Sequence, residues 1–239
     1  DGGRGREIAE ESDLGDTGCG SQTASVRMVL RNSRGQESTR EMRNKLLEME
    51  GGDGDKLLVT FDRPRDVKGS AFLTFTHQQG PDDQWLYLPA LKRVKRIASN
   101  NKSGPFMGSE FSYEDLASQE VAKYTHRYLR DDSINGRPAF VVERIPLDEK
   151  SGYTRQIVWF DQAEYRPERI EFYDRKDALL KTLTYSGYRQ YLDQYWRPDE
   201  MSMENHQTGK STQLLWEGYT FDAELSVRDF DRNSLQRAR

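Results

Sequence analysis

Alternation of apolar and polar residues with a period of two is the feature that most restricts the fold of this chain. It begins at residues 25–32, SVRMVLRN, where Val26, Met28 and Leu30 share one face, and it recurs in short runs as far as residue 221. Because successive side chains of a strand point to opposite faces, this pattern predicts antiparallel strands with one apolar and one solvated face.

Turn sequences separate these runs. Residues 51–56 (GGDGDK) and 78–84 (QQGPDDQ) are rich in Gly, Pro and Asp, and Asn135-Gly136 stands between two alternating runs. Asn-Gly is the strongest short hairpin signal, because both residues tolerate positive φ in a type I′ turn. We count about eleven strands in meander order, and no linker or change of composition divides residues 1–239 into two domains.

A sheet of about eleven strands curls strongly. Its concave apolar face must then be filled by a helix, by the opposite side of the curl or by a ligand. The sequence offers a short helix at residues 6–14, within an N-terminal helical and flexible segment 1–20, and a last helical turn at 231–237. The predicted fold is therefore mainly β with short helices.

Composition narrows the functional classes. The formal net charge of −4 provides no global attraction to nucleic acid or to an anionic membrane, so we expect no nucleic-acid partner. The sequence has no run of 18 apolar residues that would predict a transmembrane span. Cys19 is the only cysteine and cannot form an internal disulfide.

Catalytic and metal-binding patterns are missing from the sequence. The three histidines, His77, His126 and His206, lie in separate segments without metal-ligand spacing. Adjacent acidic residues, such as Glu114-Asp115, are typical of solvated turns. No nucleophile elbow, P-loop or dinucleotide-binding motif occurs. We therefore expect a protein that is not an enzyme and that has no cofactor and no metal.

A basic run at residues 91–102 contains four candidate docking residues, Lys92, Arg93, Lys95 and Arg96. Three interpretations remain open from the residues alone. The run could be an ordinary solvated face, a docking patch for an acidic protein or for lipid phosphates, or, with the nearby aromatic residues, a site for single-stranded nucleic acid.

Aromatic residues are abundant, with four Trp, ten Phe and twelve Tyr. They fill the core of a β protein in one interpretation and line a cavity for an apolar ligand in the other. The candidate ligand or lid residues are Phe72, Phe75, Trp85, Tyr87, Phe106, Met107, Phe111, Tyr113, Trp159, Phe172 and Trp216.

Two neighbouring strings carry a resemblance to a known family. WLYLPALKRVKRI at residues 85–97, followed by GPFMGSEFSYEDL at 104–116, resembles the outer-membrane lipoprotein-sorting proteins, which are larger relatives of the periplasmic lipoprotein carrier LolA. Residues 61–75 and 135–146 agree with it. The resemblance covers roughly residues 20–237.

The resemblance implies an incomplete, half-open antiparallel β-barrel of about eleven strands, plugged by helices, with a cavity for a lipid or for lipoprotein acyl chains. It also implies a periplasmic protein of a Gram-negative bacterium, and a branch that accompanies membrane exporters of the RND type. The chain begins with Asp1 rather than Met, so we expect that a signal peptide, or a part left out of a recombinant protein, was removed. An inner-membrane exporter or an outer-membrane acceptor is then the candidate partner.

Residues 104–118 are the candidate lid or plug of this cavity. Gly104 and Gly108 permit hinging, and Phe106, Met107 and Phe111 could fill an empty cavity. With Ser112 as N-cap and Asp115 at the third helical position, we expect a short helix over about 113–118. A static helix that fills the core, in a protein that serves an exporter without carrying lipid, remains the alternative.

Overall fold

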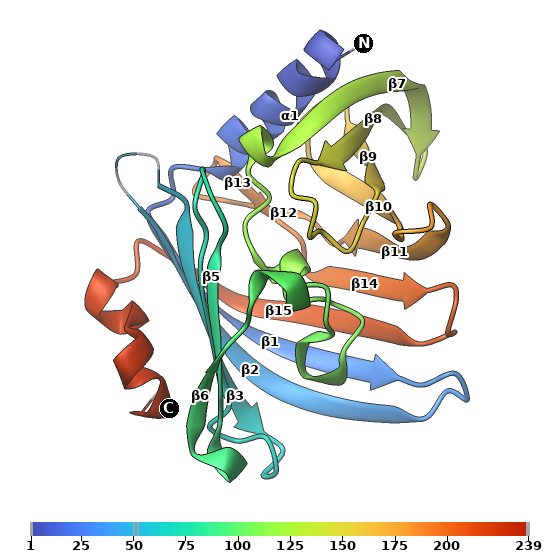
Figure 1. The fold of residues 1–239 in the computed structure, drawn as a ribbon. Coiled ribbons are helices and arrows are strands. Elements are labelled where there is room, and N and C mark those ends of the chain that lie inside the picture. The colour runs from blue at the N-terminus through green and yellow to red at the C-terminus, as the bar shows by residue number, and fades with distance from the viewer. Residues whose placement is uncertain (1, 50, 52, 238–239) are drawn as a thin grey trace.

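One large antiparallel sheet dominates the structure, a computed structural model that describes residues 2–49, 51 and 53–237 (Figure 1). Its thirteen strands run in the order β6-β5-β4-β3-β2-β1-β15-β14-β11-β10-β9-β8-β7, and β12 and β13 form a separate two-stranded sheet. The strands are β1 (Ser21–Arg31), β2 (Glu37–Glu48), β3 (Asp55–Arg63), β4 (Ala71–Phe75), β5 (Asp83–Leu88), β6 (Arg93–Arg96), β7 (Tyr124–Ile134), β8 (Arg137–Pro146), β9 (Arg155–Asp161), β10 (Pro167–Tyr173), β11 (Leu179–Ser186), β12 (Arg189–Tyr191), β13 (Tyr195–Arg197), β14 (Glu200–Asn205) and β15 (Ser211–Phe221).

Helices are short apart from α1 (Gly2–Asp16). The 3₁₀ helices are η1 (Pro89–Leu91), η2 (Ser99–Asn101), η3 (Phe106–Gly108), η4 (Glu114–Leu116), η5 (Val121–Lys123), η6 (Val227–Phe230) and η7 (Arg232–Arg237). None of the helices in the described ranges has the length and apolar character needed to cross a membrane.

The order of the strands explains why the sheet needs a long connection. From β1 the chain meanders outward to β6, which is one edge of the sheet, and it resumes at β7, which is the other edge. From β7 it meanders back until β15 pairs with β1. The connection from β6 to β7 must therefore pass from one edge of the open sheet to the other.

The two faces of the sheet bury different sets of side chains. The concave face holds the main core, in which Val59, Phe72 and Val158 are almost fully buried. On the convex face, Leu58, Leu73 and their neighbours pack under η6 and η7, which lie at the left of Figure 1. Neighbouring residues of one strand thus belong to different cores, as the period-two alternation predicts.

The mainly β, antiparallel character predicted from the sequence is confirmed, whereas the count of about eleven strands is wrong. The open sheet has thirteen strands, and β12 and β13 add two more. Among the additional strands, β12 and β13 have three residues each, so each contains too few alternations to be recognised. The Asn-Gly turn is confirmed, with φ of 52° at Asn135 and 75° at Gly136 between β7 and β8.

The N-terminal helix is longer than the predicted span of 6–14. It lies against β7, and a Cβ atom at Gly5 would stand 2.7 Å from the backbone nitrogen of Tyr128. Glycine therefore permits this close approach, and Ile8 on the next turn is buried in the main core. After the helix, the N–H groups of Gly18 and Cys19 donate to the carboxylate of Glu48 on β2.

Candidate functional site

Residues 97–123, which we call the crossing segment, connect the two edge strands β6 and β7. In Figure 1 they form the green loops and short helices in front of β14 and β15, on the inner side of the curved sheet. Hydrogen bonds from the sheet fix this position. Gln84 on β5 donates to the carbonyl of Tyr113 at 2.8 Å, and the N–H of Glu110 donates to Oγ1 of Thr212 on β15 at 2.9 Å.

The first half of the crossing segment is apolar and sealed. Phe106 and Phe111 are only 1% and 2% exposed. The ring centroid of Phe106 lies 5.7 Å from that of Phe61 and 5.3 Å from that of Phe72, both on the concave face. The N–H of Phe106 donates to the carbonyl of Phe111 at 2.8 Å, which closes a compact loop. These two aromatic rings occupy the centre of the curled sheet.

A buried ion pair holds the second half. Lys181 on β11 is 4% exposed, and its Nζ lies 2.6 Å from Oδ2 of Asp115 and 3.0 Å from the carbonyl oxygen of Glu110. The hydroxyl of Tyr153 donates to the other carboxylate oxygen of Asp115 at 2.6 Å. Burial, and then the nearby Asp115, raise the pKa of Tyr153 well above its ordinary value, so this donor keeps its proton.

The predicted helix start is present, but the helix is shorter than expected. The N–H of Asp115 donates to Oγ of Ser112 at 3.2 Å, and the N–H of Ser112 donates to the carboxylate of Asp115 at 2.8 Å, which is a capping box. The helix, η4, is a single 3₁₀ turn at Glu114–Leu116 rather than a helix over 113–118. It stops because Ala117 is extended and Ser118 bonds to Asp55 and Thr76 instead.

A cavity of about 680 Å³ lies beside this turn, between the two ends of the curled sheet. Its walls come from the β4–β5 turn, the crossing segment, the start of β7 and the end of β8. The apolar lining consists of Pro81, Ile97, Ala117, Ala122, Tyr124, Pro146 and Leu147, and the polar lining consists of Gln78, Gln79, Asp82, Gln84, Ser99, Lys102, Glu114, Ser118, Gln119, Lys123, Asp148 and Lys150, with Gly80.

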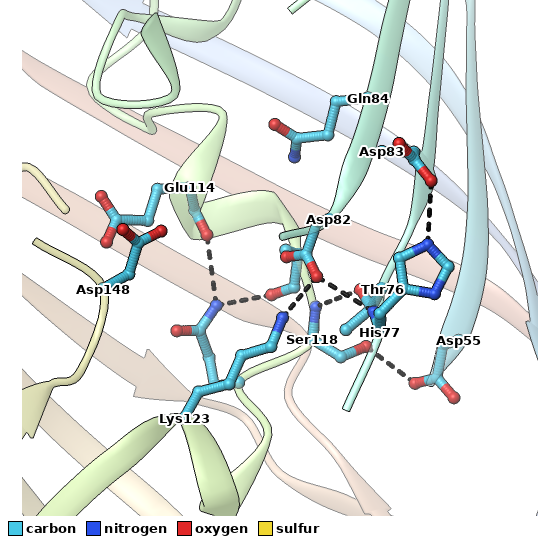
Figure 2. Close-up of polar contacts among 12 residues, drawn as sticks. Asp55, Thr76, His77, Asp82, Asp83, Gln84, Glu114, Ser118, Lys123 and Asp148 are labelled. Atoms are coloured by element: carbon cyan, nitrogen blue, oxygen red, sulfur yellow. Dashed lines mark hydrogen bonds and ion pairs between the residues drawn. The ribbon is translucent and has the colours of Figure 1, made fainter. Parts of the chain in front are cut away.

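Polar contacts across the rim tie the walls together (Figure 2). Lys123 pairs with Asp82, whose carboxylate also accepts the backbone N–H of His77 at 3.0 Å. On the opposite wall, Lys102 lies 2.6 Å from Asp148. The cavity is thus lined by both apolar and charged residues, and ion pairs join its walls.

Two carboxylates close to the rim hold their protons unusually tightly. Burial, followed by repulsion from Asp55, raises the pKa of Glu120 to about 7. Burial also raises the pKa of Asp55 to about 6, against the opposing hydrogen bond from Ser118. Both groups change charge near neutral pH, at the place where the crossing segment meets β3.

The candidate ligand residues divide between the two faces. Phe72, Phe106, Met107, Phe111, Tyr113, Phe172 and Trp216 belong to the main core of the concave face. Phe75, Trp85 and Tyr87 belong instead to the convex core, where they pack with Phe230 and Leu235 of the C-terminal segment. Trp159 lies in a second convex cluster with Ala139, Val141 and Ile157. These last four candidates face away from the cavity.

None of the individually predicted ligand residues lines the cavity. Ala117 lies in the candidate lid 104–118 and Ile97 ends the string 85–97, whereas Tyr124 and Leu147 belong to no segment that the sequence singled out as a site. Gln84 and residues 78–82 were recognised only as a turn, and Glu114 and Ser118 only as part of the candidate lid.

The basic run lies mostly on the edge strand β6. Arg96 is engaged within the fold, 2.5 Å from Asp83 and with its guanidinium carbon 5.6 Å from the centroid of Trp85. Lys92, Arg93 and Lys95 are exposed and form no ion pair with any residue that the structure describes.

Comparisons with known proteins agree with this architecture. A family model with the description "-like: Uncharacterized protein" matches residues 53–237. No curated protein matches the chain. A crystal structure described as an outer membrane lipoprotein-sorting protein domain from Vibrio parahaemolyticus is 57% identical, with a TM-score of 0.97 over 99% of this chain and 100% of that one.

Two further solved structures share the fold. A DUF1329 family protein from Desulfovibrio piger is 28% identical, with a TM-score of 0.93 over 98% of both chains. A LolA superfamily protein from Nitrosomonas europaea is 22% identical, with a TM-score of 0.76 over 96% of this chain and 98% of that one. With the resemblance seen in residues 85–116, the family model and the structure from Vibrio parahaemolyticus establish that the chain belongs to the outer membrane lipoprotein-sorting protein family, and the third structure shows that it shares the fold of a LolA superfamily protein.

Proposed function

We propose that this protein is a periplasmic carrier that binds a lipid, or the acyl chains of a lipoprotein, and transfers it toward the outer membrane. The observation that supports this most directly is the cavity of about 680 Å³ next to the crossing segment. Its volume lies in the range of about 300–1,000 Å³ that is usual for ligand sites. The likeness to the lipoprotein-sorting domain from Vibrio parahaemolyticus supports the same class of ligand.

The chemistry of the cavity suits an amphiphile. Acyl chains that pack against the apolar part of the lining gain about 0.8 kcal/mol for each methylene group removed from water. The charged rim, with Lys102, Lys123 and Lys150 among its residues, lies where a polar headgroup would remain hydrated.

Loading of a longer chain involves the crossing segment. Phe106 and Phe111 cover the concave face in the absence of a ligand, and acyl chains that replace them would recover the same apolar contacts. Gly108, with a positive φ of 75°, gives the backbone conformational freedom there. Because the ligand competes with the protein's own side chains, its net affinity stays moderate, as transfer requires.

Native mass spectrometry of the gently purified protein tests the proposal. We expect bound lipid in the wild type, and saturable uptake of lysophosphatidylglycerol by the protein after lipid removal. Ala117→Trp places a large ring in the cavity and should reduce retention at least tenfold. Ala178→Trp, in the exposed β10–β11 turn, is the matched control and should bind like the wild type.

Absence of bound lipid together with absence of uptake would contradict a carrier. So would equal retention by the Ala117→Trp and Ala178→Trp proteins, because binding would then occur outside the cavity.

The complete burial of Phe106 and Phe111 favours a second candidate, an accessory protein of an RND-type exporter that carries no lipid. In that protein the crossing segment would be a permanent part of the core. The same mass spectrometry separates the two candidates, since the accessory protein would show no lipid and would retain a membrane exporter in a pull-down.

A further inference from the structure

The tip of the β5–β6 hairpin combines an exposed apolar residue with basic residues. The tip consists of η1 (Pro89–Leu91) and Lys92, which has a left-handed φ of 48° and turns the chain into β6. Leu91 is 68% exposed, the largest exposed fraction among the large apolar residues of the described chain. In Figure 1 this tip is the lowest point of the molecule.

Exposed basic residues follow Leu91 in the sequence and also lie on a neighbouring turn. Lys92, Arg93 and Lys95 are exposed, and the neighbouring β3–β4 turn, whose Gly69 packs against Pro89, adds two more exposed basic residues and one acidic residue, Asp66. We call this group the basic end. It consists of Arg65, Lys68, Lys92, Arg93 and Lys95.

Protection of an edge strand does not account for this arrangement. Lysine and arginine on an edge strand discourage pairing with another chain, which explains basic residues on β6 itself. It does not explain an exposed leucine at the tip, nor the basic residues Lys68 and Lys92, which lie on turns.

We propose that the basic end docks the protein on an anionic membrane surface, with Leu91 inserted among the lipid headgroups. Each Lys or Arg near such a surface favours binding, and an exposed apolar side chain beside basic residues adds insertion. The overall charge of −4 makes the attraction local, so it also orients the molecule.

This docking is separate from cargo binding. The cavity is lined by the β4–β5 turn and by Ile97, which lie at the opposite end of β5 and β6 from the tip. Variants of the tip therefore leave the cavity intact, and vesicle binding can fail while lipid retention in native mass spectrometry persists, or the reverse.

Sedimentation with vesicles measures the docking. We expect the wild type to bind vesicles of phosphatidylethanolamine and phosphatidylglycerol, to bind phosphatidylcholine vesicles weakly, and to release as salt increases. Lys92→Glu/Arg93→Glu/Lys95→Glu should weaken binding at least about tenfold. The control Arg34→Glu/Lys176→Glu/Lys210→Glu makes the same change in net charge on exposed turns elsewhere and should keep most of the binding.

A second pair of variants isolates the apolar contact. Leu91→Ser should weaken vesicle binding at least about fivefold, whereas Leu192→Ser, at a position that is 61% exposed in the β12–β13 turn, should leave it unchanged. An environment-sensitive dye on Ala90→Cys should shift to the blue with anionic vesicles, whereas the same dye on Asp193→Cys should not. Cys19 is buried and should escape labelling.

Three results would overturn the proposal: no binding to anionic vesicles at low salt, equal binding by the tip and control triple variants, or no dye shift at position 90. The first would leave an acidic protein as the partner of the basic end.

Discussion

The two apolar faces of the sheet are both covered by the protein's own chain, but the covers are attached differently. On the convex face, η6 and η7 place Phe230 and Leu235 against Leu73 and Trp85, and within the described chain no side chain of residues 226–237 bonds to the sheet. On the concave face, the crossing segment combines buried aromatic rings with a buried ion pair.

This difference means that directional contacts fix the position of the concave cover, whereas, among the residues that the structure describes, apolar contacts alone hold the convex cover. Apolar contacts are non-directional, so a cover held by them alone can settle wherever it buries area. A buried ion pair is satisfied in one geometry only, and it loses its partner as soon as the segment moves. The concave cover, which also borders the cavity, is therefore held in one defined position, and this position is the closed state in the carrier that we propose.

Removing one aromatic ring from each cover is expected to have the largest effect on stability. Phe106→Ala and Phe230→Ala should each lower the free energy of unfolding by about 3–5 kcal/mol in urea titrations, because both rings are 1% exposed. Only Phe106→Ala should also alter the amount of lipid detected by native mass spectrometry. Equal changes in lipid retention by Phe230→Ala and Phe106→Ala would contradict the distinction between the two covers.

Removing the cation of the buried ion pair is expected to lower the free energy of unfolding somewhat less than removing an aromatic ring. Lys181→Met leaves Asp115 buried without its positive partner and should lower the free energy of unfolding by about 3 kcal/mol. Lys176→Met, in the exposed turn before β11, should change it by less than about 0.5 kcal/mol. Adding Asp115→Leu to Lys181→Met should restore part of the loss, and a further loss of similar size would show that the pair is not coupled.

The smallest expected effect on stability is that of Glu120, which lies where the crossing segment approaches β7. Its pKa is raised from 4.5 to about 7, chiefly by burial, so between these values the folded protein keeps a proton that the unfolded chain releases. Stability contributed by this residue is therefore lost as pH rises from about 4.5 to 7. Glu120→Gln should stabilise the protein at pH 8 by about 1 kcal/mol after allowance for solvent screening, and should change little at pH 4.

Thermal unfolding of wild type and Glu120→Gln across this pH range measures the effect. A constant difference at all pH values would show that proton binding by Glu120 is not its origin.

The two faces of a strand and the start of a helix could be predicted from the sequence, because both depend on residues that are close along the chain. Alternation separated Val158 and Phe160 from Ile157 and Trp159, and the structure places these pairs in the concave and convex cores. The reciprocal bonds of Ser112 and Asp115 follow from residues three positions apart.

The sequence did not predict which face of the sheet is concave. In β5, Trp85, Leu86 and Tyr87 are all apolar and all buried, so the pattern cannot say which of them lies on the concave face. The largest aromatic residues suggested a ligand site, but the C-terminal segment covers them instead. The ion pair joins Asp115 to a lysine 66 positions away, a pairing that only the curl of the sheet creates.

Hydrogen exchange of the crossing segment, measured with and without bound lysophosphatidylglycerol, tests the central claim most directly. The amides of Phe106 and Tyr113 now bond to Phe111 and Gly104 within that segment. If lipid displaces the concave cover, these amides should exchange faster in the loaded protein, while residues 227–230 on the convex face exchange at an unchanged rate. Equal or slower exchange over residues 104–118 in a fully loaded protein would contradict the account.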